Sequence, residues 1–296
     1  MGGYLSTKLA TAGGKAAIDA FEPFRSPAKE FSFTVTDFER VRALIHERAG
    51  IALGQGKQEM VYSRLSRRLR VLGLQSFDAY LTELQRYNDG PEWELFTNAL
   101  TTNLTSFFRE EHHFPVLAAH ARGRCGPLKL WCNASSTGEE PYSIAMTLCE
   151  AFDSLHPPVS ILATDIDTRV LAEAAQGVYA MDRIADLSEA RCKRFFLRGK
   201  GDSSGKVRVR PELRELIDFQ PLNLLAAQWA VQGPLDAIFC RNVMIYFDRP
   251  TQERLANRLG RALVPGGYLF TGRAESLNGL ALPLRCLRPS IYQKPN

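Results

Sequence analysis

The fold of this chain is decided by residues 128–142, which read LKLWCNASSTGEEPY. An apolar run, Leu128 to Trp131, stops at small and hydroxyl residues, Ala134 to Gly138, and Pro141 then opens a helical pattern. This order of strand, small-residue turn and helix is how an open α/β sheet builds a nucleotide pocket at the carboxyl ends of its strands. We therefore expect a nucleotide-type ligand at this turn.

Two acidic residues, Glu139 and Glu140, follow the turn. A loop that binds phosphate presents backbone N–H groups and a lysine rather than two negative charges. The pair favours a ligand with ribose hydroxyls, an amine or a sulfonium, and S-adenosylmethionine is the common cofactor of that description. The turn also lacks the G-x-G-x-x-G of an NAD-dependent dehydrogenase.

Composition places the chain among ordinary soluble proteins. Its 296 residues are enough for two domains, and 45% are hydrophobic, 23% charged, with a net charge of +5. No apolar run approaches the roughly 18 residues that span a bilayer, and the N-terminus lacks the apolar core of a signal peptide. We expect a cytoplasmic protein, by default a monomer, with no membrane insertion.

Metal and disulfide chemistry are not expected. The six cysteines are scattered without a Cys-x-x-Cys, which predicts free thiols. His112, His113 and His120 could suggest metal ligation, but we expect them in a helix that begins after Arg109, and we expect no metal.

The N-terminal third divides into a tail and a helical domain. Residues 1–30 are rich in small and polar residues and predict a disordered tail, and residues 31–100 predict an all-helical domain. Asp37 is expected to cap its first helix, and Gly50 to end it. Further helices are expected at about Lys57 to Leu72, around 77–84 and around 93–100.

Residues 101–296 alternate between strands and helices. Strands are expected at 128–131, 159–163, 237–240 and 268–271, with helices starting near Pro141, Thr168 and Arg249. Such alternation predicts an α/β fold with a doubly wound parallel sheet. Residues 206–210 alternate strictly and follow a Gly/Ser loop, so with 216–219 as partner strand they predict a small antiparallel insert at 198–221.

An acidic residue ends the second expected strand. Asp165 lies where α/β nucleotide folds bind ribose hydroxyls, because a carboxylate can accept two O–H bonds at once. The alternative is that Asp165 or Asp167 caps the helix starting at Thr168. We assign the cap to Asp167 and the ribose to Asp165.

Polar side chains also gather in two other segments. Asn103 to Arg109 joins the helical domain to the sheet domain, and Arg109 could pair with a carboxylate of a ligand or form an interdomain salt bridge. Asn242 and Tyr246 are hydrogen-bonding groups in an otherwise apolar run at the end of the fourth strand, which suggests a ligand. Asn223 and Leu224 lie on the approach to the same edge.

The second helix carries a basic face. Arg64, Arg67, Arg68 and Arg70 lie away from its leucine stripe, with no acidic residue between them. A charged run is usually a solvated helix face, but four arginines in seven residues favour a docking surface for an acidic partner.

These segments together resemble the chemotaxis-receptor glutamate methyltransferases of the CheR type. The resemblance covers almost all of the chain from residue 33 onward. It rests on residues 48–51, 103–110, 136–143, 163–167, 221–225 and 240–247. It implies an all-α domain before a Rossmann-like class I methyltransferase domain with an antiparallel insert, and methyl transfer from S-adenosylmethionine to receptor glutamates.

The resemblance also implies the site. Cofactor contacts are expected from Asn103, Thr105, Arg109, Glu140, Asp165, Asn223, Leu224, Arg241 and Asn242, and the basic helix is expected to face the receptor's helical bundle. In some members the insert binds a peptide at the receptor's C-terminus, and the loop and strand at 198–210 are similar to theirs. The chain departs from the usual pattern at Asn133 and Ser135, where small residues are common, and at Arg273.

The expected chemistry needs little from the protein. A glutamate with an unperturbed pKa of about 4.3 is ionised at neutral pH, so the task is alignment, which we assign to Arg109 and Tyr246. A nucleic-acid methyltransferase is disfavoured, because Cys240-Arg241-Asn242 matches neither the adenine nor the cytosine enzymes. A non-catalytic cofactor-binding module stays open through the three departures.

Overall fold

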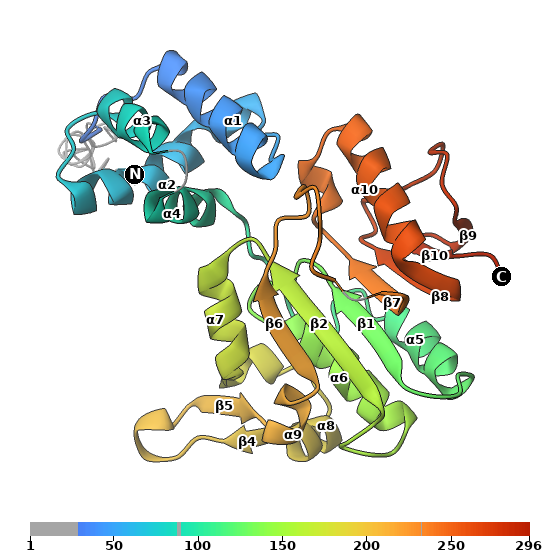
Figure 1. Cartoon of the computed structure of the whole chain (residues 1–296). Helices are drawn as coiled ribbons and strands as arrows, with labels where there is room; N and C mark the ends of the chain where they lie inside the picture. The colour runs from blue at the N-terminus through green and yellow to red at the C-terminus, as the bar shows by residue number, and fades with distance from the viewer. Residues whose placement is uncertain (1–28, 88–89, 232) are drawn as a thin grey trace, which may run out of the picture.

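The protein is described by a computed structural model over residues 29–87, 90–231 and 233–296. Most of the tail predicted at 1–30 therefore lies outside the described residues. The chain forms an N-terminal helical part and a larger α/β part (Figure 1). None of the helices in the described ranges is both long and apolar enough to cross a bilayer.

The helical part contains the expected helices: α1 Val35–Ala49, the short η1 Gln55–Lys57, α2 Gln58–Leu72, α3 Phe77–Arg86 and α4 Pro91–Leu100. Their apolar faces share one core that includes Phe38, Leu65 and Phe96. Gly50 ends α1, as predicted, and Gly73 ends α2; both adopt left-handed conformations.

The prediction that Asp37 caps α1 is wrong by three residues. Thr34 is the N-cap, and its hydroxyl accepts the Asp37 N–H at 3.1 Å, while the Asp37 carboxylate accepts the Thr34 N–H at 2.9 Å. Asp37 is the third helical residue of a capping box, which satisfies two free N–H groups at once.

The α/β part is built on a seven-stranded sheet in the order β6-β2-β1-β7-β8-β10-β9. Five strands run parallel, and β10 and β9 add an antiparallel edge. Their bounds are β1 Leu128–Cys132, β2 Val159–Asp165, β6 Ile217–Pro221, β7 Leu235–Cys240, β8 Leu263–Thr271, β9 Arg285–Arg288 and β10 Ile291–Gln293. This confirms the doubly wound sheet, and the order reverses between β1 and β7, where such folds bind ligands.

Helices cover both faces of this sheet. One core joins α5 (His113–Arg122) and α6 (Glu139–Ala151) to the sheet, and a second lies beneath α10 (Arg249–Ala262). Helix α7 (Thr168–Gln176) packs on β2 and β6 and touches α4 of the helical part. Shorter elements complete the chain: η2 Met181–Ile184, α8 Glu189–Phe195, η3 Gly201–Ser203, α9 Pro211–Arg214 and η4 Met244–Tyr246.

The small antiparallel sheet exists, but its strand pairing differs from the prediction. Strand β5 (Lys206–Val209) lies between β3 (Val178–Ala180) and β4 (Phe196–Arg198). Of the predicted partner strand, 216–219, residues 217–219 instead belong to β6, which pairs parallel with β2. Residues 217–221 extend the buried main sheet, where Ile217 contributes to the core, so the local alternation was interpreted with the wrong partner.

Candidate active site

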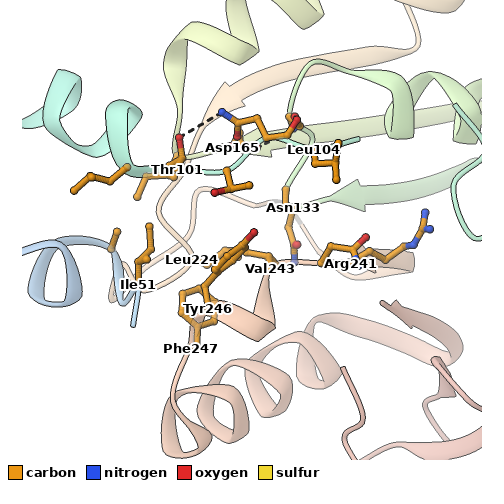
Figure 2. Close-up of a pocket in the computed structure, with 18 of the residues that line it drawn as sticks. Ile51, Thr101, Leu104, Asn133, Asp165, Leu224, Arg241, Val243, Tyr246 and Phe247 are labelled. Atoms are coloured by element: carbon orange, nitrogen blue, oxygen red, sulfur yellow. Dashed lines mark hydrogen bonds between the residues drawn. The ribbon is translucent and has the colours of Figure 1, made fainter. Parts of the chain in front are cut away.

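A pocket opens at the carboxyl ends of the central parallel strands (Figure 2). Its wall comes from both parts of the chain: residues 49–60, the linker around 100–109, and the loops that follow β1, β2, β6 and β7. The structure brings together here every predicted cofactor and alignment residue: Asn103, Thr105, Arg109, Glu140, Asp165, Asn223, Leu224, Arg241, Asn242 and Tyr246.

The small-residue turn shapes this pocket. Gly138 has φ +99°, and a Cβ there would lie 2.9 Å from the Ala174 Cβ and 2.8 Å from the Tyr179 hydroxyl. Glycine is therefore required both for the backbone conformation and for the close approach of α7. The turn delivers Glu139 and Glu140 into the first turn of α6.

Asp165 ends β2 at the pocket wall and is nearly enclosed. Its carboxylate accepts the backbone N–H of Ser136 at 2.8 Å and that of Asp167 at 3.0 Å. Burial raises its pKa to about 6, and the two N–H donors oppose that shift. The group therefore remains mostly ionised at neutral pH and lies where the prediction expects ribose hydroxyls.

Asp167 caps α7, as predicted, and also anchors the linker. Its carboxylate accepts the N–H groups of Arg169 and Val170. It further accepts the Thr101 hydroxyl at 2.8 Å and the Asn103 side-chain amide at 2.7 Å. The Asn103 amide also donates to the Thr101 hydroxyl at 3.4 Å. The Asn103 amide thus already binds the protein.

Each of the two glutamates that follow the turn forms an ion pair. Arg241 donates to Glu140 at 2.7 Å, and Arg183 donates to Glu139. Burial raises the pKa of Glu140, and the Arg241 guanidinium opposes that shift. The two glutamates are therefore not free negative charges that select the ligand, because arginines from distant parts of the chain compensate both.

The loop after β7 is held by a residue whose role the sequence did not reveal. Asn242 has φ +57°, and its backbone N–H donates to Glu275 at 2.7 Å. The same carboxylate accepts the N–H groups of Gly272 and Ile245. Glu275 is 5% exposed and lies two residues after Arg273, and no local sequence pattern links it to the loop that it holds.

The two predicted alignment residues face the pocket from different elements. Arg109 belongs to the linker, where its guanidinium donates to the Leu104 carbonyl at 2.8 Å. Tyr246 belongs to η4, and its carbonyl accepts the Ala52 N–H at 2.8 Å. The Asn223 side-chain amide also donates a hydrogen bond to the Arg48 carbonyl at 2.8 Å. These two hydrogen bonds join the helical part to the sheet part beside the pocket.

The basic face of α2 is largely occupied within the protein. Arg64 donates to the Thr101 carbonyl at 2.6 Å, Arg68 forms a two-bond ion pair with Glu92, and Arg70 pairs with Glu30. Arg67 is exposed and forms no ion pair with any other described residue. The four arginines therefore do not form one free cationic patch.

A possible metal-ligand cluster combines Glu110, His112 and His113, whose ligand atoms lie within 4.8 Å of one another. Both histidines contact the Ser290 hydroxyl through Nε2, at 3.1 and 2.8 Å. Burial, with help from Arg241, lowers the pKa of His113 to about 3. Arginine charges beside the rings disfavour a bound cation, and the buried His113 packs against Phe270.

Known proteins match both parts of the chain. Residues 36–101 match the family model described as CheR methyltransferase, all-alpha domain, and residues 103–291 match CheR methyltransferase, SAM binding domain. The chemotaxis protein methyltransferase of Klebsiella aerogenes is 50% identical over 277 residues, which cover 94% of this chain and 96% of that protein.

Two further relatives agree with this match. Chemotaxis protein methyltransferase 2 of Pseudomonas aeruginosa is 52% identical over 89% of this chain and 95% of its own. The chemotaxis protein methyltransferase of Escherichia coli K12 is 51% identical over 86% and 89%. Among solved structures, a putative S-adenosyl-L-methionine-dependent methyltransferase from Methanococcus maripaludis covers 55% of this chain and 56% of its own, with 14% identity and a TM-score of 0.31.

Proposed function

Because the chain belongs to the CheR methyltransferase family, we propose that it methylates glutamate side chains of chemoreceptor cytoplasmic domains in chemotactic adaptation. Family membership makes it an S-adenosylmethionine-dependent methyltransferase. The observation that carries the proposal is the shared pocket, in which the side chains suited to the cofactor and those suited to an incoming carboxylate line one cavity. The product is a glutamate methyl ester.

The reaction asks for alignment rather than proton transfer. Bound S-adenosylmethionine supplies a methyl group activated by its sulfonium sulfur. The receptor carboxylate forms an O–C bond to that methyl as the C–S bond breaks, and the bonding pair stays on sulfur in S-adenosylhomocysteine. No proton moves, because a glutamate with a pKa of about 4.3 is already ionised. Charge is lost in the transition state, so a pocket that excludes water favours the step.

The cofactor side of the pocket is formed by two acidic anchors. Asp165 has free lone pairs after its two backbone bonds and accepts the ribose hydroxyls. Glu140, fixed by Arg241, faces the cofactor from the first turn of α6. Further proposed contacts come from Asn103, Thr105, Arg109, Asn223, Leu224, Arg241 and Asn242.

Arg109 and Tyr246 orient the receptor carboxylate. One guanidinium N–H of Arg109 holds the Leu104 carbonyl, which leaves other donors for a carboxylate oxygen. Replacing Arg109→Ala should lower the methylation rate constant at saturating cofactor about tenfold. Arg122→Ala, which removes an exposed arginine of α5, is the matched control. Unchanged turnover in the Arg109 variant would contradict this role.

The receptor is contacted outside the pocket as well. We assign the initial contact with the acidic, methylatable bundle to α2 (Arg64, Arg67, Arg68 and Arg70), where Arg67 is exposed and forms no ion pair with a described residue. The antiparallel insert is the proposed site for a receptor C-terminal peptide, because β3 and β4 have no outer neighbour among the described strands.

The enzyme acts on the receptor's cytoplasmic domain, hence in the cytoplasm, and as a monomer. In this proposal residues 31–100 make the initial docking contact, and residues 101–296 contain the insert and carry out methyl transfer.

Transfer of radiolabelled methyl from S-adenosylmethionine to a purified receptor cytoplasmic fragment tests the proposal. A parallel fragment carries alanine at its adaptation glutamates. Base-labile label on the first fragment alone is the expected result. Cofactor binding without any label on the first fragment would instead favour a non-catalytic module or another acidic partner.

A further inference from the structure

Asn133 lies at the centre of the pocket, at one of the three positions where the chain departs from the usual family pattern. It directly follows β1, and its backbone N–H still donates to the Phe239 carbonyl of β7 at 3.0 Å. The side chain is 2% exposed and lines the pocket. Figure 2 shows it between Asp165 and Val243, with its amide end towards the latter.

Both polar atoms of this side chain lack a hydrogen-bond partner among the described residues. The amide lies close enough to the Cys240 thiol to oppose the rise in that thiol's pKa that burial causes, but it pairs with no oxygen or nitrogen atom of the described residues. Burial of an amide without partners is unfavourable, and nearly all buried amides in proteins are satisfied. An unpaired carboxamide that faces a ligand pocket is therefore suited to bind the ligand itself.

The sheet order indicates which part of the ligand it meets. Asp165 ends β2, Asn133 follows β1, and Arg241 and Asn242 follow β7, so Asn133 lies between the ribose end and the substrate end. This inference rests on the proposed function, in which the bound cofactor extends from Asp165 towards Arg241 and Asn242. The amino-acid arm of the cofactor carries an ammonium and a carboxylate. A carboxamide can accept a hydrogen bond from the ammonium and donate one to the carboxylate.

We propose that the Asn133 carboxamide binds the amino-acid arm of the cofactor, a contact that proteins with a small residue at this position do not have. The matched control is Ser135, the other departure in the same turn. Its hydroxyl is also buried and unpaired, but Ser135 does not line the pocket.

Calorimetric titration of two ligands tests the assignment. S-adenosylhomocysteine carries the amino-acid arm, whereas 5′-methylthioadenosine lacks it. Asn133→Ala should weaken S-adenosylhomocysteine binding about tenfold, as expected for loss of a hydrogen bond to a charged group, and leave 5′-methylthioadenosine within twofold. Ser135→Ala should leave both affinities unchanged. An unchanged affinity for S-adenosylhomocysteine in the Asn133 variant, or equal losses for both ligands, would overturn the proposal.

A measurement on the unmodified protein guards against a folding defect in the variant. With asparagine selectively labelled with ¹⁵N, the Asn133 side-chain NH2 resonances should shift on addition of S-adenosylhomocysteine and not with 5′-methylthioadenosine. Shifts of equal size with both ligands would contradict the contact. Neither readout involves a receptor, so a chain that binds S-adenosylhomocysteine but methylates no receptor refutes the proposed function and leaves this inference standing.

Discussion

At the scale of single residues, the proposed ribose contact of Asp165 should make cofactor binding sensitive to pH. Burial raises its pKa to about 6, and only the ionised form can accept two ribose hydroxyls. Affinity for S-adenosylhomocysteine should therefore be full above about pH 7 and fall as pH drops through 6, approaching tenfold per pH unit below it. Calorimetry from pH 7.5 to 5 measures this. Asp165→Asn should bind weakly and without that slope, and a flat wild-type profile would refute the ribose role.

Glu275 should support the site through the backbone. Glu275→Gln replaces one acceptor oxygen with an NH2 donor. In one orientation this donor faces the N–H of Ile245, and in the other it faces the N–H groups of Asn242 and Gly272. We expect the free energy of unfolding to fall by about 1–3 kcal/mol and the methylation rate to fall with it. Urea unfolding and the transfer assay measure both. The exposed Glu215→Gln serves as control, and equal stability of the two variants would contradict the role.

Residue types at motif positions predicted which side chains line the pocket, but not their partners. Arg241 and Glu140 were both expected at the cofactor, yet their ion pair joins positions 101 residues apart. Glu275 likewise acts on Asn242 from 33 residues away. Such pairs depend on how the strands are ordered in the sheet, and no local spacing encodes that order.

At the scale of elements, α2 carries one arginine that we propose binds the receptor and another that stabilises the fold. Arg67 is exposed and without a protein partner in the described ranges, whereas Arg68 and Glu92 form two bonds at 2.9 and 2.6 Å. Arg67→Ala should raise the KM for a receptor fragment several-fold, more so at low salt, and leave stability unchanged. Arg68→Ala should lower the free energy of unfolding by about 1–2 kcal/mol, because Glu92 loses its partner. Initial rates and thermal melts separate the two, and an unaltered KM in the Arg67 variant would remove α2 from the docking surface.

The helices were predictable from the sequence because their signals are local. Apolar spacing and the two glycines predicted the C-terminal ends of α1 and α2 to within one residue. The five parallel strands and β5 were also expected, whereas the short strands β3, β4, β9 and β10 were not. Strand pairing was not predictable either: β5 joins β3 and β4, and residues 217–219 join β2. The alternation of apolar and polar residues along a strand shows which side chains share a face, but it does not identify the neighbouring strand.

At the scale of the whole molecule, the pocket depends on the helical part being fastened to the sheet part. Gly50 has φ +70°, and a Cβ there would lie 2.3 Å from Leu225 Cδ1. Gly73 has φ +67° with nothing within 4 Å of such a Cβ. Both Gly→Ala changes add left-handed strain of about 1–2 kcal/mol, but only at Gly50 must the Leu225 side chain shift to make room for the new methyl group.

We therefore expect Gly50→Ala, and not Gly73→Ala, to weaken S-adenosylhomocysteine binding, because residues 49–60 form part of the pocket wall. Calorimetry on the two variants tests this. Equal affinities would mean that the sheet part binds the cofactor without help from the helical part.

Mass spectrometry of the receptor product tests the central claim most directly. A chemoreceptor cytoplasmic fragment is incubated with the enzyme and S-adenosylmethionine that carries a trideuterated methyl group, then digested and sequenced by fragmentation. The account predicts the trideuteromethyl mass on glutamate side chains of the helical bundle, and its loss after mild base. The same mass on another residue type, or none despite bound cofactor, would contradict the assignment of this enzyme as a glutamate methyltransferase.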